Sequence, residues 1–350
     1  MPFLRNCWYM AGWSHEVQAK RLLGRRVAGE AMMLFRDPAG VVHATGDRCP
    51  HRFAPLHLGH HLGDRVQCAY HGLQFDGSGR CVHNPHGSGA IAPHAKVASY
   101  PLVERWGCLW VWPGEAAAAD PSTIPDFSCL DEEVNHVGHG YMLANADYRL
   151  ETDNIMDLSH IEFLHPGTLG GGGVSSGKTE VNQDGTTVWS RRMIRSQTVP
   201  DFIYRTFGIE HGTPLDRRVD VRWDPPASML IFASFKPSVA PDDAFRGRRI
   251  ANIFTPETET TTHYWYAISY DARALPPENG KAIAQKATDD LRQPFEKEDL
   301  PMLEAVQASM EGADFWSLRP LILESDVGAV RARRTLDKLI CEEQGVKAVA

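Results

Sequence analysis

Four metal-ligand side chains occur in the pattern C-x-H-x16-C-x2-H, formed by Cys49, His51, Cys68 and His71. Two thiolates and two imidazoles on a pair of loops can hold a [2Fe–2S] cluster in which the cysteines bind one iron and the histidines bind the other. A cluster with this ligand set moves single electrons at a raised potential. The pattern therefore predicts an iron–sulfur site in the N-terminal part of the chain.

The same four ligands also suit a tetrahedral zinc ion, which is the alternative reading of the pattern. Zinc sites usually group cysteine with cysteine and histidine with histidine, whereas each segment here supplies one of each. The mixed arrangement favours the iron–sulfur cluster, of the Rieske type.

Short apolar segments and turn residues surround these ligands. Strands are expected at residues 31–36 and 41–45, and again at 66–68 and 73–75, with Gly- and Pro-containing turns between them. Both ligand pairs are then expected at the tips of hairpins. The break after Trp112-Pro113-Gly114 predicts an all-β first domain over residues 1–114 and a second domain over residues 115–350.

A second group of candidate ligands lies about a hundred residues further along the chain. Asn154, Asp157 and His160 recur every three residues, so on one helix they share a face. His165 does not fit that face, but Pro166 pushes it out of the helical region, so the helix is expected to end near Leu164 and His165 can turn back.

Two histidines near a helix end, with a carboxylate from elsewhere, make the facial triad of non-haem Fe(II) oxygenases. The alternative is that both histidines are simply packed or solvated on an amphipathic helix. The cluster motif on the same chain favours the iron site.

Together the two sites resemble the oxygenase component of the Rieske non-haem iron oxygenases. Within that family the chain looks most like the O-demethylases of vanillate and dicamba, and p-toluenesulfonate methyl-monooxygenase is also similar. The segments that carry the resemblance are residues 49–55, 67–75, 82–87, 110–114, 153–165 and 255–259.

The resemblance implies an α+β fold, in which an N-terminal all-β Rieske domain precedes a catalytic domain of the helix-grip type. The periodicities of the second part agree, because strands are expected at 187–192, 219–223, 229–235, 249–254 and 263–270, and a helix at 281–310. A homotrimeric ring is also implied, with the Rieske domain of one chain against the catalytic domain of the next.

The third iron ligand must be a distant carboxylate. Spacing cannot choose among Asp290, Glu296, Glu298 and Asp299, which all lie in one acidic helical region. The family pattern selects Asp299. The alternative is that Asp299 caps a helix that begins at Pro301.

Two polar residues of the 154–165 segment gain roles only from the resemblance. Asp157 resembles the residue that bridges the two metal centres between subunits, through a Rieske histidine of one chain and an iron-binding histidine of its neighbour. Asn154 is expected to contact an iron ligand rather than iron itself.

Substrate-binding residues are the least constrained part of the sequence. Asn252 shares an inward strand face with Ile250 and Phe254, and its amide could bind a substrate oxygen or equally a protein carbonyl. Ile231 and Asn252 occupy the positions aligned with the polar dicamba contacts, which makes dicamba itself a poor candidate.

Residues 169–177, with four consecutive glycines, are either a lid over the iron or a plain flexible connection.

The expected activity is hydroxylation of a methyl or methoxy carbon of an aromatic acid, using O2 and two electrons, with formaldehyde released when an O-methyl group is removed. The alternatives are ring dihydroxylation or monooxygenation of another small substrate, and a Rieske electron carrier whose second site is vestigial. The position of the target carbon decides between the oxygenase reactions.

Charge and motifs limit the partners. A net charge of −8 argues against nucleic acid, and the chain contains no apolar run of about 18 residues, the length needed to span a bilayer. The N-terminus lacks a secretory h-region, which predicts the cytoplasm. No dinucleotide-binding fingerprint is present, so electrons from NAD(P)H must arrive through a separate reductase, which the resemblance implies to contain flavin and an iron–sulfur centre.

Overall fold

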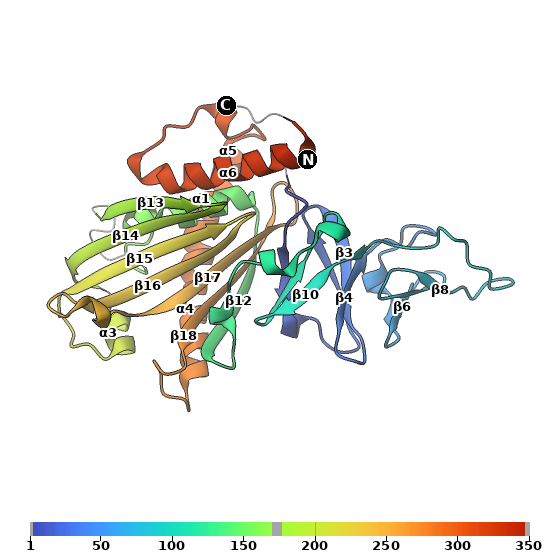
Figure 1. The fold of residues 1–350 in the computed structure, drawn as a ribbon, viewed down its shortest axis with the longest axis horizontal. Helices are drawn as coiled ribbons and strands as arrows, with labels where there is room; N and C mark the ends of the chain where they lie inside the picture. The colour runs from blue at the N-terminus through green and yellow to red at the C-terminus, as the bar shows by residue number, and fades with distance from the viewer. Residues whose placement is uncertain (1–2, 170–176, 200, 347–350) are drawn as a thin grey trace. The chain divides into compact units, whose positions relative to one another are not determined.

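The computed structural model describes residues 3–169, 177–199 and 201–346, and it divides the chain into two compact units. The first unit comprises Met1–Ile124 with Thr255–Glu259, and the second comprises Pro125–Phe254 with Thr260–Ala350. Figure 1 shows mainly short strands in the N-terminal part of the chain and a large sheet with helices in the later part. The predicted order of the domains, an all-β domain followed by an α+β domain, is therefore confirmed.

Three small antiparallel sheets build the first unit. They contain, in spatial order, β1 (Tyr9–Trp13), β11 (Cys108–Val111) and β10 (Leu102–Arg105); β2 (Leu22–Val27), β3 (Glu30–Arg36), β4 (Val42–Gly46) and β9 (Ser99–Tyr100); and β5 (His60–His61), β6 (Arg65–Gln67), β7 (Gln74–Asp76) and β8 (Cys81–His83). The paired hairpins expected around the cluster ligands correspond to β3–β4 and β6–β7.

A hydrophobic cluster lies beneath the two ligand segments. Met33, Phe35, Val66 and Phe75 are buried together with Cys49 and other apolar side chains. The first four of these residues come from β3, β6 and β7, whose alternating pattern turns them to a common interior. The core of this subdomain therefore fixes the base of both ligand loops.

The first unit extends to Ile124 rather than to the expected boundary at residue 114. Hydrogen bonds explain the longer unit, because Trp8 Nε1 donates to Asp120 O at 2.8 Å and an Arg105 guanidinium nitrogen donates to Pro121 O at 3.0 Å. Residues 115–124 thus belong to the first unit instead of beginning the second domain.

One seven-stranded antiparallel sheet forms the centre of the second unit. Its spatial order is β12 (Asn135–Ala144), β18 (Thr262–Asp271), β17 (Arg246–Pro256), β16 (Ser228–Pro237), β15 (Leu215–Asp224), β14 (Thr187–Gln197) and β13 (Lys178–Asp184). All five strands expected from the sequence lie within β14 to β18. The sequence analysis missed β12 and β13; the exposed, polar β13 lacks a continuous apolar pattern.

The helices of this unit are α1 (Tyr148–Met156), α2 (Ile161–Leu164), α3 (Asp201–Phe207), α4 (Gly280–Pro294), α5 (Leu300–Ser309) and α6 (Val327–Gln344). Helix α4 packs on β12 and β18, and α6 packs on β14 (Figure 1). Gly138 in β12 permits the close approach of α4, because a Cβ atom at this position would lie 2.4 Å from the carbonyl oxygen of Ala284 in α4. In the described part of the chain, no helix is long and apolar enough to cross a membrane.

Candidate metal centres and adjoining cavity

The two cluster-ligand loops share one backbone pattern. In the first loop, Cys49 N–H donates to Ala54 O and Phe53 N–H donates to Cys49 O, both at 2.9 Å. In the second loop, Cys68 N–H donates to Leu73 O at 2.8 Å and Gly72 N–H donates to Cys68 O at 3.0 Å. The fifth residue of each loop, Phe53 or Gly72, adopts a positive φ of 60° or 74°. Two similar tight turns thus present the ligands, as the sequence predicts.

The four side chains form a thiol pair and an imidazole pair. Cys49 and Cys68 are buried, and their thiols interact with each other. The rings of His51 and His71 lie with their centroids 4.4 Å apart. A Rieske cluster needs one pair of thiolates for one iron and one pair of imidazoles for the other, and the site offers both pairs.

Burial is the main reason that the pKa of the Cys49 thiol is raised to about 11. The neighbouring Cys68 thiol raises it further, and the backbone N–H of His51 opposes the rise. Such a thiol binds as thiolate only where a metal ion supplies positive charge. The site therefore fits the cluster that its ligand set predicts.

The segment that carries the histidines is not one continuous helix. Helix α1 ends at Met156, a 3₁₀ turn covers Leu158–His160, and α2 covers Ile161–Leu164. The expectation that Asn154, Asp157 and His160 share one helix face is wrong, because Asp157 leaves the helical region with φ −114° and ψ 94°. The expected end at Leu164 is confirmed, with His165 as the C-terminal cap of α2.

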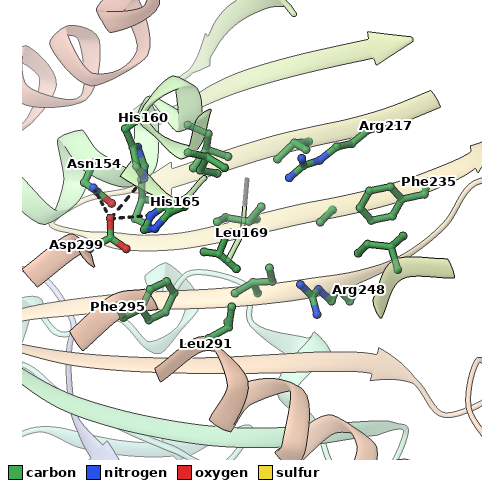
Figure 2. A pocket seen from close by; sticks show the side chains of 18 residues that line it. Asn154, His160, His165, Leu169, Arg217, Phe235, Arg248, Leu291, Phe295 and Asp299 are labelled. Carbon is green, nitrogen blue, oxygen red and sulfur yellow. Dashed lines mark hydrogen bonds and ion pairs between the residues drawn. The ribbon is translucent and has the colours of Figure 1, made fainter. Parts of the chain in front are cut away.

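Three predicted ligands nevertheless converge. Donor atoms of His160, His165 and Asp299 all lie within 4.8 Å of one another. His165 Nε2 lies 3.1 Å and His160 Nε2 lies 3.5 Å from the same Asp299 oxygen, as Figure 2 shows. A neutral ring that donates from Nδ1 turns the lone pair of Nε2 toward this carboxylate, an arrangement that a bound cation stabilises. The donor set therefore fits Fe(II).

A π-helix positions the carboxylate. Residues Phe295–Asp299 form a π-helical turn between α4 and α5, and the Asp299 side chain makes no capping hydrogen bond to α5. The capping alternative for Asp299 is therefore wrong. π-Helical turns change which side chains face inward, and they are frequent at functional sites.

The competing carboxylates have other partners. Asp290 pairs with Lys286 and Glu296 pairs with Arg292, each at 2.7 Å on the outer face of the helix. Glu298 instead accepts a hydrogen bond from Nδ1 of His165 and another from Thr168 Oγ1, the latter at 2.7 Å. Glu298 is thus placed to support the candidate ligand His165, a role that sequence spacing did not reveal.

Each histidine is held through Nδ1, which leaves Nε2 to face the common point. His160 Nδ1 donates to the backbone carbonyl of Asp157 at 2.8 Å, and His165 Nδ1 donates to Glu298. Burial lowers the pKa of His160. Burial also lowers that of His165, but its contacts with the Asp299 and Glu298 carboxylates outweigh burial, so the His165 pKa is raised.

Asp157 contacts the iron-site histidine in a different way from the expected one. Its backbone carbonyl, not its carboxylate, holds His160. The carboxylate accepts from Ser159 N at 2.9 Å and Ser159 Oγ at 2.7 Å, and an Arg192 nitrogen lies 3.4 Å away. Asn154 Nδ2 donates to Asp299 at 3.0 Å, as expected for a residue that supports a ligand.

An apolar cavity adjoins the three ligands (Figure 2). Its wall includes Ile155, Leu158, Ile161, Ile203, Val219, Ile231, Ala233, Phe235, Ile250, Leu291 and Phe295. Ile231 lies where the sequence analysis expected a pocket residue. Leu169 also lines the cavity, whereas most of the predicted lid, residues 170–176, lies outside the described residues.

Asn252 does not belong to this wall. It is fully buried, and its amide accepts from Tyr264 OH at 2.6 Å and donates to Ile250 O at 3.3 Å. The alternative of a protein partner is therefore correct and the substrate-contact reading is wrong. The polar side chains that reach the cavity from the strands are Arg217 and Arg248, which the sequence analysis missed. Arg248 was detectable, since it lies two residues before Ile250 on the same strand face.

Comparisons with known proteins match both parts of the chain to protein families. Residues 7–101 match the Rieske [2Fe-2S] domain family, and residues 144–342 match the vanillate O-demethylase oxygenase C-terminal domain. The oxygenase component of dicamba O-demethylase from Stenotrophomonas maltophilia is 36% identical, covering 97% of this chain and 98% of that protein.

Two further similarities extend over nearly the whole chain. The oxygenase component of chloroacetanilide N-alkylformylase from Rhizorhabdus wittichii (strain DC-6 / KACC 16600) is 38% identical, covering 99% of both chains. The crystal structure of dicamba monooxygenase bound to 3,6-dichlorosalicylic acid superposes with a TM-score of 0.90 at 35% identity, covering 98% of this chain and 99% of that one.

Proposed function

The chain belongs to the oxygenase components of the Rieske non-haem iron oxygenases, and on that premise we propose that it hydroxylates a methyl or methoxy carbon of a small aromatic acid. When the carbon is part of an O-methyl group, hydroxylation gives a hemiacetal that breaks down to a phenol and formaldehyde. The single observation that carries the proposal is the convergence of a His–His–Asp set on the end of an apolar cavity.

The cofactors are a Rieske [2Fe–2S] cluster and mononuclear Fe(II). We assign Cys49, His51, Cys68 and His71 to the cluster, and His160, His165 and Asp299 to Fe(II). When bound, the iron supplies the activation of O2 that inserts one oxygen atom into a C–H bond.

The protein side chains around the iron ligands fix and shield this chemistry. Glu298 and the Asp157 carbonyl hold the Nδ1–H groups, so each imidazole presents Nε2 in one orientation. The apolar wall excludes water from the target carbon and positions it, which decides between attack on a methyl group and attack on a ring.

An oxygenase component of this family receives its electrons from a separate reductase. We propose that this partner contains flavin and an iron–sulfur centre, that NAD(P)H supplies it in the cytoplasm, and that the oxygenase is a homotrimer. In that ring Asp157 would connect the cluster of one subunit to the iron site of the next.

A second candidate reaction is removal of an N-alkyl group from an anilide. It is favoured by the 38% identity to the chloroacetanilide N-alkylformylase component, and it requires the same hydroxylation of a carbon beside a heteroatom. The electron-carrier alternative is disfavoured by the preserved ligand set and by the full-length match to oxygenases.

The test is a screen of methoxylated benzoates, N-alkyl anilides and unsubstituted benzoates, with O2, a surrogate reductase and NADH. We expect O2 uptake coupled to formaldehyde with one or more methoxybenzoates. The control variant His160→Ala should keep the cluster absorbance and lose turnover, because it removes one of three iron ligands. Aldehyde release from the anilides alone, or a diol from unsubstituted benzoate, would replace the proposed reaction.

A further inference from the structure

Two guanidinium groups enter the otherwise apolar cavity away from the metal ligands. Figure 2 shows Arg217 and Arg248 on the opposite side of the cavity from His160 and Asp299. Among the described residues that line this cavity, Asp299 is the only carboxylate, and it faces the two histidines. No acidic side chain of the wall therefore lies on the side of the arginines.

The sheet register places both arginines on one face. Arg217 of β15 is paired with Phe235 of β16, and Arg248 of β17 is paired with Ala233 of β16. Phe235 and Ala233 are two residues apart on one strand and so point to the same side. The arginines are thus diagonal neighbours across β16, and both face the cavity.

Arg217 is buried without a countercharge. None of its side-chain nitrogens makes a hydrogen bond or ion pair with a described residue, and its Nε is fully buried. Its guanidinium lies 5.7 Å from the Phe235 ring centroid, a contact that offsets little of the cost of burying a charge. Burial, followed by the charges of Arg248 and Arg192, lowers its pKa to about 10, so it remains a cation at neutral pH.

Arg248 is the better anchored member of the pair. It is 9% exposed, and one guanidinium nitrogen lies 3.5 Å from the hydroxyl of Tyr270. The charge of Arg248 acts on Arg217 and disfavours its cationic form. A ligand oxyanion between the two guanidinium groups offsets this repulsion, since guanidinium groups bind oxyanions through paired N–H donors.

We propose that Arg217 and Arg248 form a subsite for the anionic group of the substrate, a carboxylate or a sulfonate. The inference rests on the proposed function and deepens it. The oxyanion binds at the arginine end, the apolar wall covers the ring, and the methyl or methoxy carbon then lies at the iron end. Both arginines therefore select acids over neutral analogues and fix which carbon is presented.

Binding can be measured without turnover by calorimetry on the oxidised holoenzyme under anaerobic conditions. The probes are 4-methoxybenzoate, 4-methoxybenzenesulfonate and the neutral 4-methoxybenzamide. We expect either or both anions to bind at least tenfold more tightly than the amide, and their ranking distinguishes a carboxylate site from a sulfonate site. Arg217→Gln and Arg248→Gln should each weaken anion binding about 10- to 100-fold and leave the amide nearly unchanged.

Matched controls lie beside each arginine. Arg218→Gln and Arg249→Gln change neighbouring residues of the same strands whose side chains point to the other face, and they should bind the anions as the parent does. The conservative Arg217→Lys and Arg248→Lys variants keep the charge and should retain part of the affinity. Cluster absorbance and circular dichroism verify that each variant is folded.

Two results overturn the subsite: equal parent affinity for the amide and the anions, or anion binding that is unchanged in folded Arg217→Gln and Arg248→Gln variants. Failure of the proposed reaction has a different signature. In that case the anions still bind through the arginine pair, but no methoxybenzoate supports formaldehyde release with the reductase.

Discussion

At the scale of single residues, the iron site depends on the atoms behind the ligands. The imidazoles of His160 and His165 each have two ring nitrogens. When one nitrogen donates a hydrogen bond, the lone pair of the other nitrogen can bind metal. A backbone carbonyl serves His160, whereas a carboxylate serves His165. The two histidines therefore differ in how a mutation can disturb them, and Glu298 is the side chain to test.

Glu298→Gln should weaken Fe(II) binding about 10- to 100-fold, because the amide accepts a weaker hydrogen bond from His165 and removes a negative charge behind the ligand. The cluster spectrum should not change. Iron binding is measured by titrating the apo mononuclear site with Fe(II) under anaerobic conditions. Glu296→Gln is the control, since that carboxylate pairs with Arg292 on the surface. Equal Fe(II) affinity in both variants would show that Glu298 does not support the site.

At the scale of elements, the break between α1 and α2 delivers the two histidines from one short segment. Helix α1 is capped by Asp147, whose carboxylate accepts from Arg149 N, and it carries a buried acid, Glu151. Burial is the main cause that raises the pKa of Glu151 to about 8, and the charges of Asp299 and Glu304 add to it. The anchoring helix thus contains a group whose protonation affects stability.

This shift predicts a pH dependence of unfolding. Between pH 4.5, the ordinary pKa, and pH 8, the folded state keeps a proton on Glu151 that the unfolded state releases. The free energy of unfolding should therefore fall as pH rises through this window, by at most about 1.4 kcal/mol per pH unit. Above pH 8 this contribution stays constant.

Glu151→Gln should abolish the part of the pH-dependent decrease in the free energy of unfolding that Glu151 causes. The variant should then be more stable than the parent near pH 8. Denaturant unfolding at several pH values measures the difference between the two proteins. Glu342→Gln, in an exposed pair with Lys338, should follow the parent curve. A parallel pH dependence in parent and Glu151→Gln would refute the assigned protonation.

At the scale of the whole molecule, one chain contains both metal centres but in separate compact units. The proposed trimer gives each cluster an iron site on a neighbouring subunit, with Asp157 at the junction. Burial raises the pKa of its carboxylate, but hydrogen bonds from Ser159 and Ser325 and the Arg192 charge outweigh burial, so the pKa is lowered. Asp157 is therefore charged at neutral pH, as an electrostatic bridge to an imidazole requires.

Asp157→Asn should leave both metal sites occupied and slow electron transfer between them severely, because the charge that orients a neighbouring imidazole is lost. Single turnover of the pre-reduced enzyme with O2 and substrate, followed by cluster absorbance, measures the rate. Asp290→Asn, on the surface of α4, is the control. Cluster oxidation at the parent rate in Asp157→Asn, or a monomer in sedimentation analysis, would remove the basis for the bridge.

The sequence by itself predicted the kinds of ligand at both metal centres. Ligand type and short spacing are local properties, so Cys49, His51, Cys68 and His71 could be read from two loops, and Pro166 indicated where the helix before His165 ends. The alternation of apolar residues also predicted the central strands β14 to β18. The choice of Asp299 needed the family resemblance, because its spacing did not distinguish it from three other acids.

Tertiary structure decided the features that depend on residues far apart in the chain. The π-helical turn directs Asp299 toward the two histidines, whereas Asp290 and Glu296 form ion pairs on the surface. No local sequence pattern distinguishes these acidic residues. The strand face of Asn252 left both a substrate contact and a protein partner open, and Tyr264 from the next strand satisfies its amide. Arg217 and Arg248 face one cavity only because β16 lies between their strands, and sheet order is set by packing of the whole domain rather than by either strand alone.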